Sequence, residues 1–355
     1  MPNYFRPNVE AMSGYAPGEQ PRPEERVIKL NTNENPYPPG PRVMAALRDI
    51  PADALRRYPD PMASRLRRAA SQLWGVPPEM ILAGNGSDDL LTIAVRSFAG
   101  EGDTVAFPWP TYSLYDSLCE IQGARALHVD WPDDYRLPAG LADTGAKLVF
   151  VANPNAPSGT FVPVEELERF ASRIPGVLAV DEAYADFAED TFLRVIRRHR
   201  NVIVLRTLSK SYSLAGARIG LAVADPEIIA GMVKVKDSYN VDALCDRLGA
   251  AALEDQEHFR AGVDKIRSER ARLTGLLAGL GFRVLPSQAN FVLARRPAPD
   301  AKALYLGLKE RGVLVRYFDR PGLRDALRIT VGLPEETDAL IAALRGLLPA
   351  ASAGR

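Results

Sequence analysis

The pattern of hydrophobic and polar residues alternates between two kinds of segment through the first two thirds of the chain. Short apolar runs fit buried strands, and the longer amphipathic segments between them fit helices. The predicted strands cover residues 81–83, 104–107, 147–152, 177–180, 201–205 and 218–222. Strands and helices in alternation are typical of a mainly parallel sheet with helices on both faces. We therefore predict an α/β fold.

Two other patterns flank this region. Residues 1–40 are rich in proline, asparagine and glycine and show no periodicity, so we expect an arm that packs on the C-terminal domain or on a partner subunit. A long charged amphipathic helix over residues 257–280 marks a change of domain. We therefore predict an N-terminal arm (1–40), a large α/β domain (41–256) and a small α+β domain (257–355).

Prolines and a glycine-rich turn define the first predicted helices of the large domain. One helix is expected from Pro41 to the residues before Pro59, where the proline stops it. The sequence GNGSDD precedes a later helix, which Ser87 or Asp88 can cap. Because glycines before a helix let backbone N–H groups approach an anion, this turn is a candidate phosphate site. Glycine-rich turns are common, so this turn alone establishes nothing.

A lysine follows the strand predicted over residues 201–205. Thr207, Ser209 and Lys210 come directly after the strand, and Arg218 lies a few residues further on. The end of a buried strand opens on the crevice where α/β sheets bind ligands, and hydroxyls with an arginine can bind a phosphate there. Taken alone, this segment is more often an ordinary surface lysine. An amine that forms a Schiff base beside a phosphate is, however, what pyridoxal 5′-phosphate (PLP) requires.

Two further strand ends are expected at the same edge of the sheet. Asp181 follows one strand and is a candidate partner for the pyridine nitrogen of PLP, and Tyr184 and Asn155 are candidate partners for the ring oxygen. Tyr112 is a candidate for stacking on the ring. Each residue also has an ordinary explanation as a cap, a core residue or part of a turn. Their combination with Lys210 favours a PLP site.

Composition excludes other classes of function. The chain has 44 Lys and Arg and 44 Asp and Glu, so its formal net charge of zero gives no general attraction to nucleic acid or to an anionic membrane. No apolar run reaches the ~20 residues that cross a bilayer, and no signal-peptide pattern is visible, so we expect a soluble cytoplasmic protein. The two cysteines, Cys119 and Cys245, lack metal-ligand spacing, and no metal site is predicted.

The order of these motifs resembles the fold-type I PLP-dependent aminotransferases, and among them most the enzymes that act on histidinol phosphate. The resemblance covers nearly the whole chain and rests on the segments LNTNENPYPP, RYPDP, GNGSDDLL, PWPTY, NPNAPSGT, VDEAY, RTLSKSYSLAGARIG, SQANF and LRITVG. The segment around Lys210 is the most specific. Many relatives have asparagine where this chain has Ala156, and alanine cannot contact the ring oxygen. That contact is left to Asn155 or to Tyr184 alone.

The resemblance implies a role for each site residue. Lys210 would carry PLP and act as the general base, Asp181 would pair with the pyridinium, and Tyr184 with the ring oxygen. The implied phosphate ligands are Gly86, Ser87, Asp88, Thr207, Ser209 and Arg218. Tyr58 resembles a tyrosine that reaches the phosphate in the neighbouring subunit, which implies a homodimer with shared active sites. The implied substrate-binding residues are Arg316 and Arg328, suited to phosphate or carboxylate, with Tyr15 and Asn290.

The reaction implied by the resemblance is transamination of L-histidinol phosphate with 2-oxoglutarate, which yields imidazole-acetol phosphate and L-glutamate in histidine biosynthesis. An aromatic amino-acid aminotransferase is the first alternative. A PLP-dependent threonine-phosphate decarboxylase and a non-catalytic PLP-fold module are further alternatives. A decarboxylase would release CO₂ without 2-oxoglutarate, and the intact set of Lys210, Asp181 and Tyr184 argues against a non-catalytic module.

Overall fold

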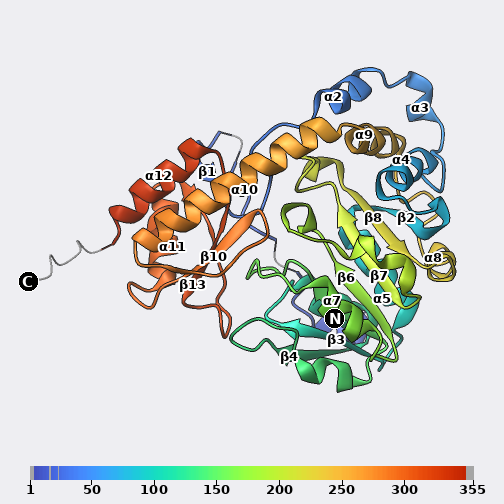
Figure 1. The fold of residues 1–355 in the computed structure, drawn as a ribbon, viewed down its shortest axis with the longest axis horizontal. Helices are drawn as coiled ribbons and strands as arrows, with labels where there is room; N and C mark the ends of the chain where they lie inside the picture. Colours follow the sequence, from blue (N-terminus) through green and yellow to red (C-terminus); the bar gives the residue numbers. More distant parts are fainter. Residues whose placement is uncertain (1–3, 16, 23, 349–355) are drawn as a thin grey trace, which may run out of the picture.

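The computed structural model describes residues 4–15, 17–22 and 24–348. A larger part is built around an extended sheet, and a smaller part contains β10, β13, α11 and α12 (Figure 1). The long helix α10 (Gln256–Gly279) runs from one part to the other (Figure 1). None of the helices in the described ranges is long and apolar enough to cross a lipid bilayer.

The larger part contains a seven-stranded sheet in the order β2-β8-β7-β6-β5-β3-β4. All neighbours pair in parallel except β8, which is antiparallel to β7 and to β2. The mainly parallel α/β fold predicted from the sequence is therefore confirmed. The strands are β2 (Ile81–Asn85), β3 (Thr104–Trp109), β4 (Arg125–Asp130), β5 (Leu148–Ala152), β6 (Val177–Asp181), β7 (Val202–Thr207) and β8 (Ile219–Ala224).

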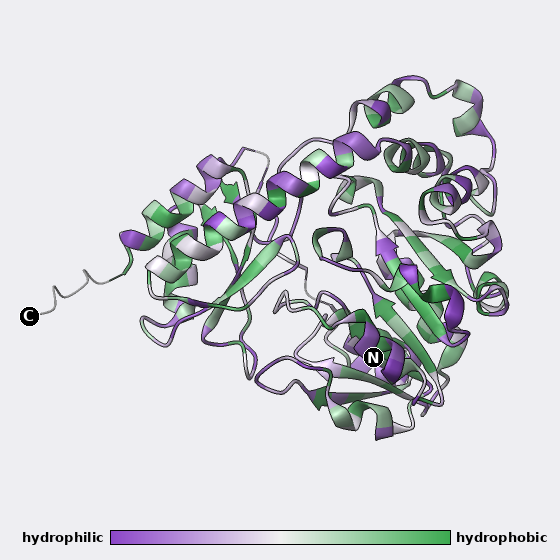
Figure 2. Cartoon of the chain, in the orientation of Figure 1, coloured by the Kyte–Doolittle hydropathy of each residue, from purple (hydrophilic) through white to green (hydrophobic). Residues whose placement is uncertain are grey.

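Successive residues of the central strands pack into two separate cores, one on each face of the sheet. Val149 and Val151 of β5 contribute to one core, whereas Leu148 and Phe150 contribute to the other. Burial on both faces explains why these strands are almost uniformly apolar, as the colouring in Figure 2 shows. The first core contains residues of α4 (Ser64–Trp74), α7 (Val164–Ala171) and α9 (Ala243–Glu254), and the second contains residues of α5 (Gly86–Phe98), α6 (Leu114–Gln122) and α8 (Pro226–Val233).

Two predicted helix boundaries were wrong. The single helix expected from Pro41 is divided into α2 (Pro41–Arg48) and α3 (Ala52–Arg56), because Pro51 interrupts it. The helix after the glycine-rich turn begins at Gly86, so Ser87 and Asp88 lie inside its first turn and do not cap it. The short 3₁₀ turns are η1 (Pro78–Met80), η2 (Ala139–Thr144), η3 (Ala185–Phe187), η4 (Phe192–Arg194), η5 (Ile196–Arg198) and η6 (Ala215–Ala217).

The smaller part has a four-stranded antiparallel sheet in the order β12-β13-β10-β9. Helices α10, α11 and α12 contribute residues to its core. The elements are β9 (Arg283–Val284), β10 (Phe291–Arg295), α11 (Ala301–Glu310), β12 (Arg316–Tyr317), β13 (Ala326–Thr330) and α12 (Pro334–Arg345). In α11, the side chain of Asp300 caps the helix by accepting a hydrogen bond from the backbone N–H of Lys302.

The N-terminal segment connects the two parts. Helix α1 (Pro7–Ala11) lies against α6, where Asn8 Nδ2 donates a hydrogen bond of 2.6 Å to the backbone carbonyl of Glu120. Strand β1 (Ile28–Lys29) pairs in parallel with β11 (Val313–Leu314). Between α1 and β1, the described residues Ser13, Gly14, Tyr15, Pro17, Gly18 and Gln20 line a cavity that residues of both parts also line.

Candidate active site

A cavity of about 550 Å³ lies where the N-terminal segment, the carboxyl end of the large sheet and the smaller part meet. Its walls contain Lys210, Asp181 and Tyr184, which the sequence predicted to lie together. The strand register accounts for this, because Asp181 of β6 is aligned with Ala152 of β5 and Leu205 of β7. No group of three or more His, Cys, Asp or Glu side chains in the described residues is arranged to hold a metal ion.

Lys210 lies in the turn that follows β7 and extends into this cavity. Its Nζ donates a hydrogen bond of 3.3 Å to the backbone carbonyl of Thr32 and lies 6.0 Å from the centre of the Tyr184 ring. Burial lowers the pKa of Lys210 to about 8, and the positive charge of Arg328 contributes to the decrease. An appreciable fraction of the amine is therefore neutral near neutral pH, as a nucleophile or a general base requires.

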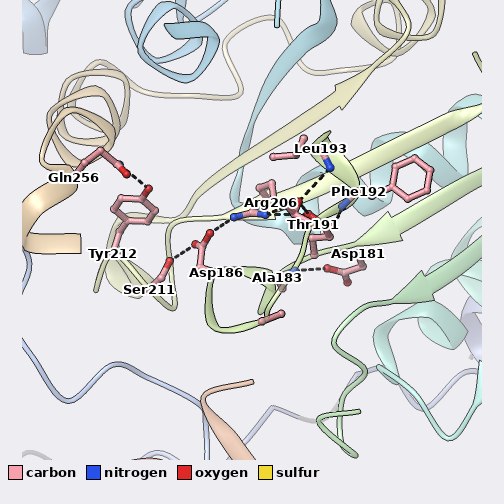
Figure 3. A network of polar contacts seen from close by, with 12 residues as sticks. Asp181, Ala183, Asp186, Thr191, Phe192, Leu193, Arg206, Ser211, Tyr212 and Gln256 are labelled. Atoms are coloured by element: carbon pink, nitrogen blue, oxygen red, sulfur yellow. Dashed lines mark hydrogen bonds and ion pairs between the residues drawn. The ribbon is translucent and has the colours of Figure 1, made fainter. Parts of the chain in front are cut away.

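Asp181 is the last residue of β6 and is only 5% exposed. Its Oδ2 accepts a hydrogen bond of 2.7 Å from the hydroxyl of Tyr115. Its Oδ1 accepts one of 3.1 Å from the backbone N–H of Ala183, which Figure 3 shows. Burial raises the pKa of Asp181 to about 6, and the two hydrogen bonds oppose that increase. A buried carboxylate in a cavity wall is suited to a cationic ligand such as a protonated pyridine.

A residue of the N-terminal segment, Asn33, holds Tyr184 in place. The hydroxyl of Tyr184 accepts a hydrogen bond of 2.9 Å from Nδ2 of Asn33, and burial raises the pKa of Tyr184. Asn33 is fixed in turn by Thr330, whose Oγ1 donates to Asn33 Oδ1 at 3.0 Å. The sequence did not identify Asn33, although its motif, LNTNENPYPP, was part of the resemblance.

The residues expected to bind a phosphate gather at one end of the cavity. Gly86 and Ser87 lie in the first turn of α5, Thr207 is the last residue of β7, Ser209 follows that strand, and Arg218 precedes β8. Hydroxyl groups, an arginine and a helix N-terminus are the usual donors of a phosphate site. Gly86 has φ +79° and a Cβ there would lie 2.7 Å from Arg218 Nη2, so the close approach of this turn to Arg218 requires glycine.

Asp88 differs from the expectation in one respect. Its carboxylate accepts a hydrogen bond of 3.0 Å from Arg218 Nη2 and one of 3.2 Å from the hydroxyl of Tyr112. Because an ionised carboxylate is only an acceptor, Asp88 can bind a phosphate only through its backbone N–H. Its side chain instead orients Arg218 and Tyr112.

The structure brings Tyr112 to the cavity but does not bring Asn155 there. Tyr112 lines the cavity, and its ring meets that of Tyr15 edge-on at 6.0 Å. Asn155 is buried away from it: Oδ1 accepts a hydrogen bond of 2.7 Å from Thr111, and Nδ2 donates to Ser158 Oγ at 2.8 Å. The next residue, Ala156, is one of those that line the cavity. The ring-oxygen contact expected of Asn155 is therefore left to Tyr184.

Tyr58 does not line this cavity. It is 81% exposed and stacks on Tyr239 with ring centres 4.6 Å apart. A second, open cavity of about 410 Å³ surrounds it, with Arg57, Arg65 and Arg247 among the lining residues. Within the single chain, Tyr58 and Lys210 therefore belong to different cavities.

Three of the four predicted substrate-binding residues line the cavity: Tyr15, Arg316 and Arg328. Arg328 Nη2 donates a hydrogen bond of 2.8 Å to the backbone carbonyl of Asn31, whereas its buried Nε has no partner among the described residues. A buried unpartnered donor in a cavity wall indicates an anionic ligand. Asn290, the fourth, is fully buried and donates to the backbone carbonyl of Asn33 at 3.0 Å, so it supports the wall without forming part of it.

A buried ionic network behind the cavity connects the ends of β6 and β7 (Figure 3). Arg206 pairs with Glu182 at 2.9 Å and with Asp186, and Asp186 also accepts a hydrogen bond from the hydroxyl of Ser211, next to Lys210. Glu182 also accepts a hydrogen bond of 2.6 Å from Thr191. The sequence did not predict this network, which fixes the turn that carries Lys210.

Comparisons with known proteins agree with this geometry. The family model described as aminotransferase class I and II matches residues 25–344. The chain is 50% identical to histidinol-phosphate aminotransferase 1 of a Nostoc species, over 98% of this chain and 99% of that protein. It is 46% identical to histidinol-phosphate aminotransferase of Geotalea uraniireducens, over 96% of this chain and 98% of that protein.

Solved structures with a similar fold are also known. A crystal structure of histidinol-phosphate aminotransferase from Sinorhizobium meliloti in complex with pyridoxal-5'-phosphate is 29% identical to this chain. It has a TM-score of 0.88 and covers 98% of this chain and 99% of its own. A structure of L-threonine-O-3-phosphate decarboxylase from Porphyromonas gingivalis shares the fold. It is 23% identical to this chain, has a TM-score of 0.79 and covers 90% of this chain and 99% of its own.

Proposed function

Because the chain belongs to the class I and II aminotransferases, we propose that it transfers the amino group of L-histidinol phosphate to 2-oxoglutarate. The products are imidazole-acetol phosphate and L-glutamate, a step of histidine biosynthesis. The observation that carries the proposal is the cavity itself, whose walls contain the Lys210 amine, the Asp181 carboxylate and the side chains of Arg316 and Arg328.

The residues of the cavity fit pyridoxal 5′-phosphate. Lys210 would bind its aldehyde, Asp181 its pyridine nitrogen and Tyr184 its ring oxygen. The phosphate would be held by the backbone N–H groups at the start of α5 and by the side chains of Thr207, Ser209 and Arg218. When bound, PLP supplies an electron-accepting ring that stabilises negative charge on the substrate α-carbon.

Lys210 is the general base of the proposed reaction. With its pKa lowered to about 8, its Nζ is able to accept the substrate α-proton and to return it as an acid. Asp181, with its pKa of about 6, is ionised at neutral pH and would keep the pyridine nitrogen of a bound PLP protonated. The Tyr115 hydroxyl and the Ala183 N–H hold that carboxylate in place.

Arg316 and Arg328 select the substrate by its anionic group. Arginine binds phosphate and carboxylate oxygens in pairs, which suits both a phosphate monoester and the two carboxylates of 2-oxoglutarate. The aromatic rings of Trp109, Tyr112 and Phe318 also line the cavity and would accept an imidazole. The same rings favour aromatic amino acids as the second candidate substrate class.

Spectroscopy of the half-reaction tests the proposal. Purified holoenzyme is mixed with L-histidinol phosphate, phenylalanine or threonine phosphate in the absence of 2-oxoglutarate, and conversion of the bound cofactor to its amine form is followed by absorbance. We expect histidinol phosphate to react with the highest efficiency. Higher efficiency with phenylalanine, or release of CO₂ from threonine phosphate, would overturn the assignment.

We also infer a homodimer in which Tyr58 reaches the site of the partner subunit. The support is the high exposure of Tyr58 and the arginine-rich cavity around it. Light scattering should give twice the chain mass. Tyr58→Phe should weaken PLP binding about ten-fold, the effect of one lost hydrogen bond to a charged group. Tyr305→Phe, in a stacked tyrosine pair of the smaller part, is the control and should leave it unchanged.

A further inference from the structure

The rim of the cavity carries a third arginine, Arg320, that the family resemblance did not assign. Arg320 lies in the loop between β12 and β13, the strands that hold Arg316 and Arg328, and all three line the cavity. The guanidinium of Arg320 forms no hydrogen bond or ion pair with any residue in the described part of the chain. Its guanidinium carbon lies 5.5 Å from the centre of the Trp109 ring.

The loop holds Arg320 at a defined position. Leu323 is buried, and its backbone N–H donates a hydrogen bond of 3.1 Å to the carbonyl of Arg320. Arg295 Nη2 donates one of 2.7 Å to the carbonyl of Gly322, which ties the loop to β10. These two bonds fix the backbone at Arg320, so less freedom is lost when a ligand binds there.

Trp109, next to Arg320 in the cavity lining, is also fixed. The Trp109 ring lies parallel to the His128 ring, with centres 4.5 Å apart and planes within 6°. His128 Nε2 in turn contacts Asp116 Oδ1 at 2.6 Å. Trp109 thus offers a rigid aromatic surface on which a guanidinium can lie flat with its N–H groups directed outward.

Negatively and positively charged side chains lie in different parts of the cavity wall. The carboxylates among the described lining residues are Asp88 and Asp181, and both belong to the cofactor end, Asp88 bound to Arg218 and Asp181 bound to Tyr115. The smaller part contributes only the arginines to the charged lining. A monocarboxylate needs one arginine, whereas a phosphate dianion offers three oxygens and about two negative charges.

We propose that Arg320 is a specificity residue that binds the phosphate group of the substrate together with Arg316, and that Trp109 orients its guanidinium. This inference rests on the proposed function and narrows it. The third arginine favours a phosphate monoester dianion over the carboxylate of an aromatic amino acid. The preference for a phosphate group then depends on Arg320 at the rim of the cavity, in addition to the two arginines that the family motif contains.

A pair of variants in the same loop tests the inference. Arg320→Gln removes the proposed contact, and Arg324→Gln removes an equal charge from an arginine that instead pairs with Asp319 at 2.8 Å and does not line the cavity. We expect R320Q to raise KM for histidinol phosphate about ten-fold, as expected for a charge-assisted hydrogen bond at a partly solvated rim, with KM for unphosphorylated L-histidinol unchanged. R324Q should leave both values within about two-fold.

Equal KM values for histidinol phosphate in R320Q and R324Q would overturn the role of Arg320. An equal loss with L-histidinol would also overturn it, because the effect would not depend on phosphate. If the unmodified protein does not use histidinol phosphate as a substrate, the proposed function is wrong, but the role of Arg320 can still be tested. Competitive inhibition by inorganic phosphate, measured with whichever amino donor is used, then tests Arg320 directly: its inhibition constant should rise in R320Q and not in R324Q.

Discussion

The hydroxyl of Tyr115 donates a hydrogen bond of 2.7 Å to Oδ2 of Asp181, and Tyr115 is completely buried. The two residues come from α6 and β6, 66 positions apart in the chain. Burial raises the pKa of Asp181 to about 6, and this hydrogen bond is the strongest influence in the opposite direction. The bond therefore helps to keep the carboxylate ionised at neutral pH.

Tyr115→Phe should move the acid limb of the activity profile to higher pH. The variant keeps the ring, which stacks on Phe150 at 4.6 Å, and removes only the donor to Asp181. Because the pKa of Asp181 then rises further, we expect kcat/KM to fall about ten-fold near pH 6 and less than two-fold near pH 8.5. A profile of kcat/KM against pH measures this. A uniform loss at every pH would show that Tyr115 acts through packing alone.

Asp181→Asn should stabilise the apoprotein while weakening cofactor binding. The folded-state pKa of Asp181, about 6, is above its ordinary 3.8, so its stabilising contribution is complete below pH 3.8 and is lost as pH rises through 6. Asparagine avoids this loss, and the apoprotein should gain up to about 3 kcal/mol near pH 7.5. Urea unfolding of both apoproteins near pH 5 and pH 7.5 measures the difference. A variant that is less stable at both pH values would contradict the prediction.

Lys210 should acquire PLP at a rate that depends on pH. Its pKa of about 8 means that the neutral, nucleophilic amine predominates only above that pH, so the rate at which the apoprotein gains the visible absorbance of bound cofactor should rise to a plateau with its midpoint near 8. Arg328→Gln removes a positive charge that lowers the pKa of Lys210, and its midpoint should lie at higher pH. Lys210→Ala should give no such absorbance. An identical midpoint in R328Q would exclude the influence of Arg328.

Patterns in the sequence identified several residues that line one cavity, among them Asp181 and Lys210, but not all of the residues that hold them in place. Asp181 and Lys210 follow apolar runs, and the alignment of Asp181 with Leu205 brings their strand ends together. Tyr115 could not be recognised, because a tyrosine on the apolar face of a helix looks the same whether or not its hydroxyl binds a carboxylate. Asn33 meets Tyr184 across 151 positions, a separation that no local pattern reports.

For Asn155 and β4, the sequence pattern led to a wrong prediction and a missed strand. The position of Asn155 after a strand was correctly recognised, but hydrogen bonds to Thr111 and Ser158 turn its amide away from the cavity. Strand β4 was not predicted, because at the edge of the sheet it combines half-buried residues with exposed ones such as Arg125 and lacks a buried apolar run. Side-chain direction and edge position depend on tertiary contacts, which periodicity does not contain.

Arg206→Met should destabilise the protein by about 3–5 kcal/mol, the cost of leaving buried carboxylates without their cation. The side chain of Glu182 is 0% exposed and that of Asp186 is 13% exposed, so neither can recover its hydration by moving into solvent. Arg194→Met is the matched control, because Arg194 also pairs with two carboxylates, Glu165 and Asp190, but at an exposed site. Its unfolding midpoint should hardly change.

The same network should influence Lys210, because Ser211 donates a hydrogen bond to Asp186. In Arg206→Met, Asp186 keeps its hydrogen bond from Ser211 but loses the cation that holds its carboxylate in place, so the turn after β7 is less firmly fixed. We therefore expect slower uptake of PLP as well as lower stability. Adding Glu182→Gln and Asp186→Asn to R206M removes the unpaired charges and should restore most of the stability, whereas uptake of PLP should stay slow because no guanidinium holds the side chain at position 186 against the turn. If uptake recovered together with stability, the network would serve folding alone and would not position Lys210.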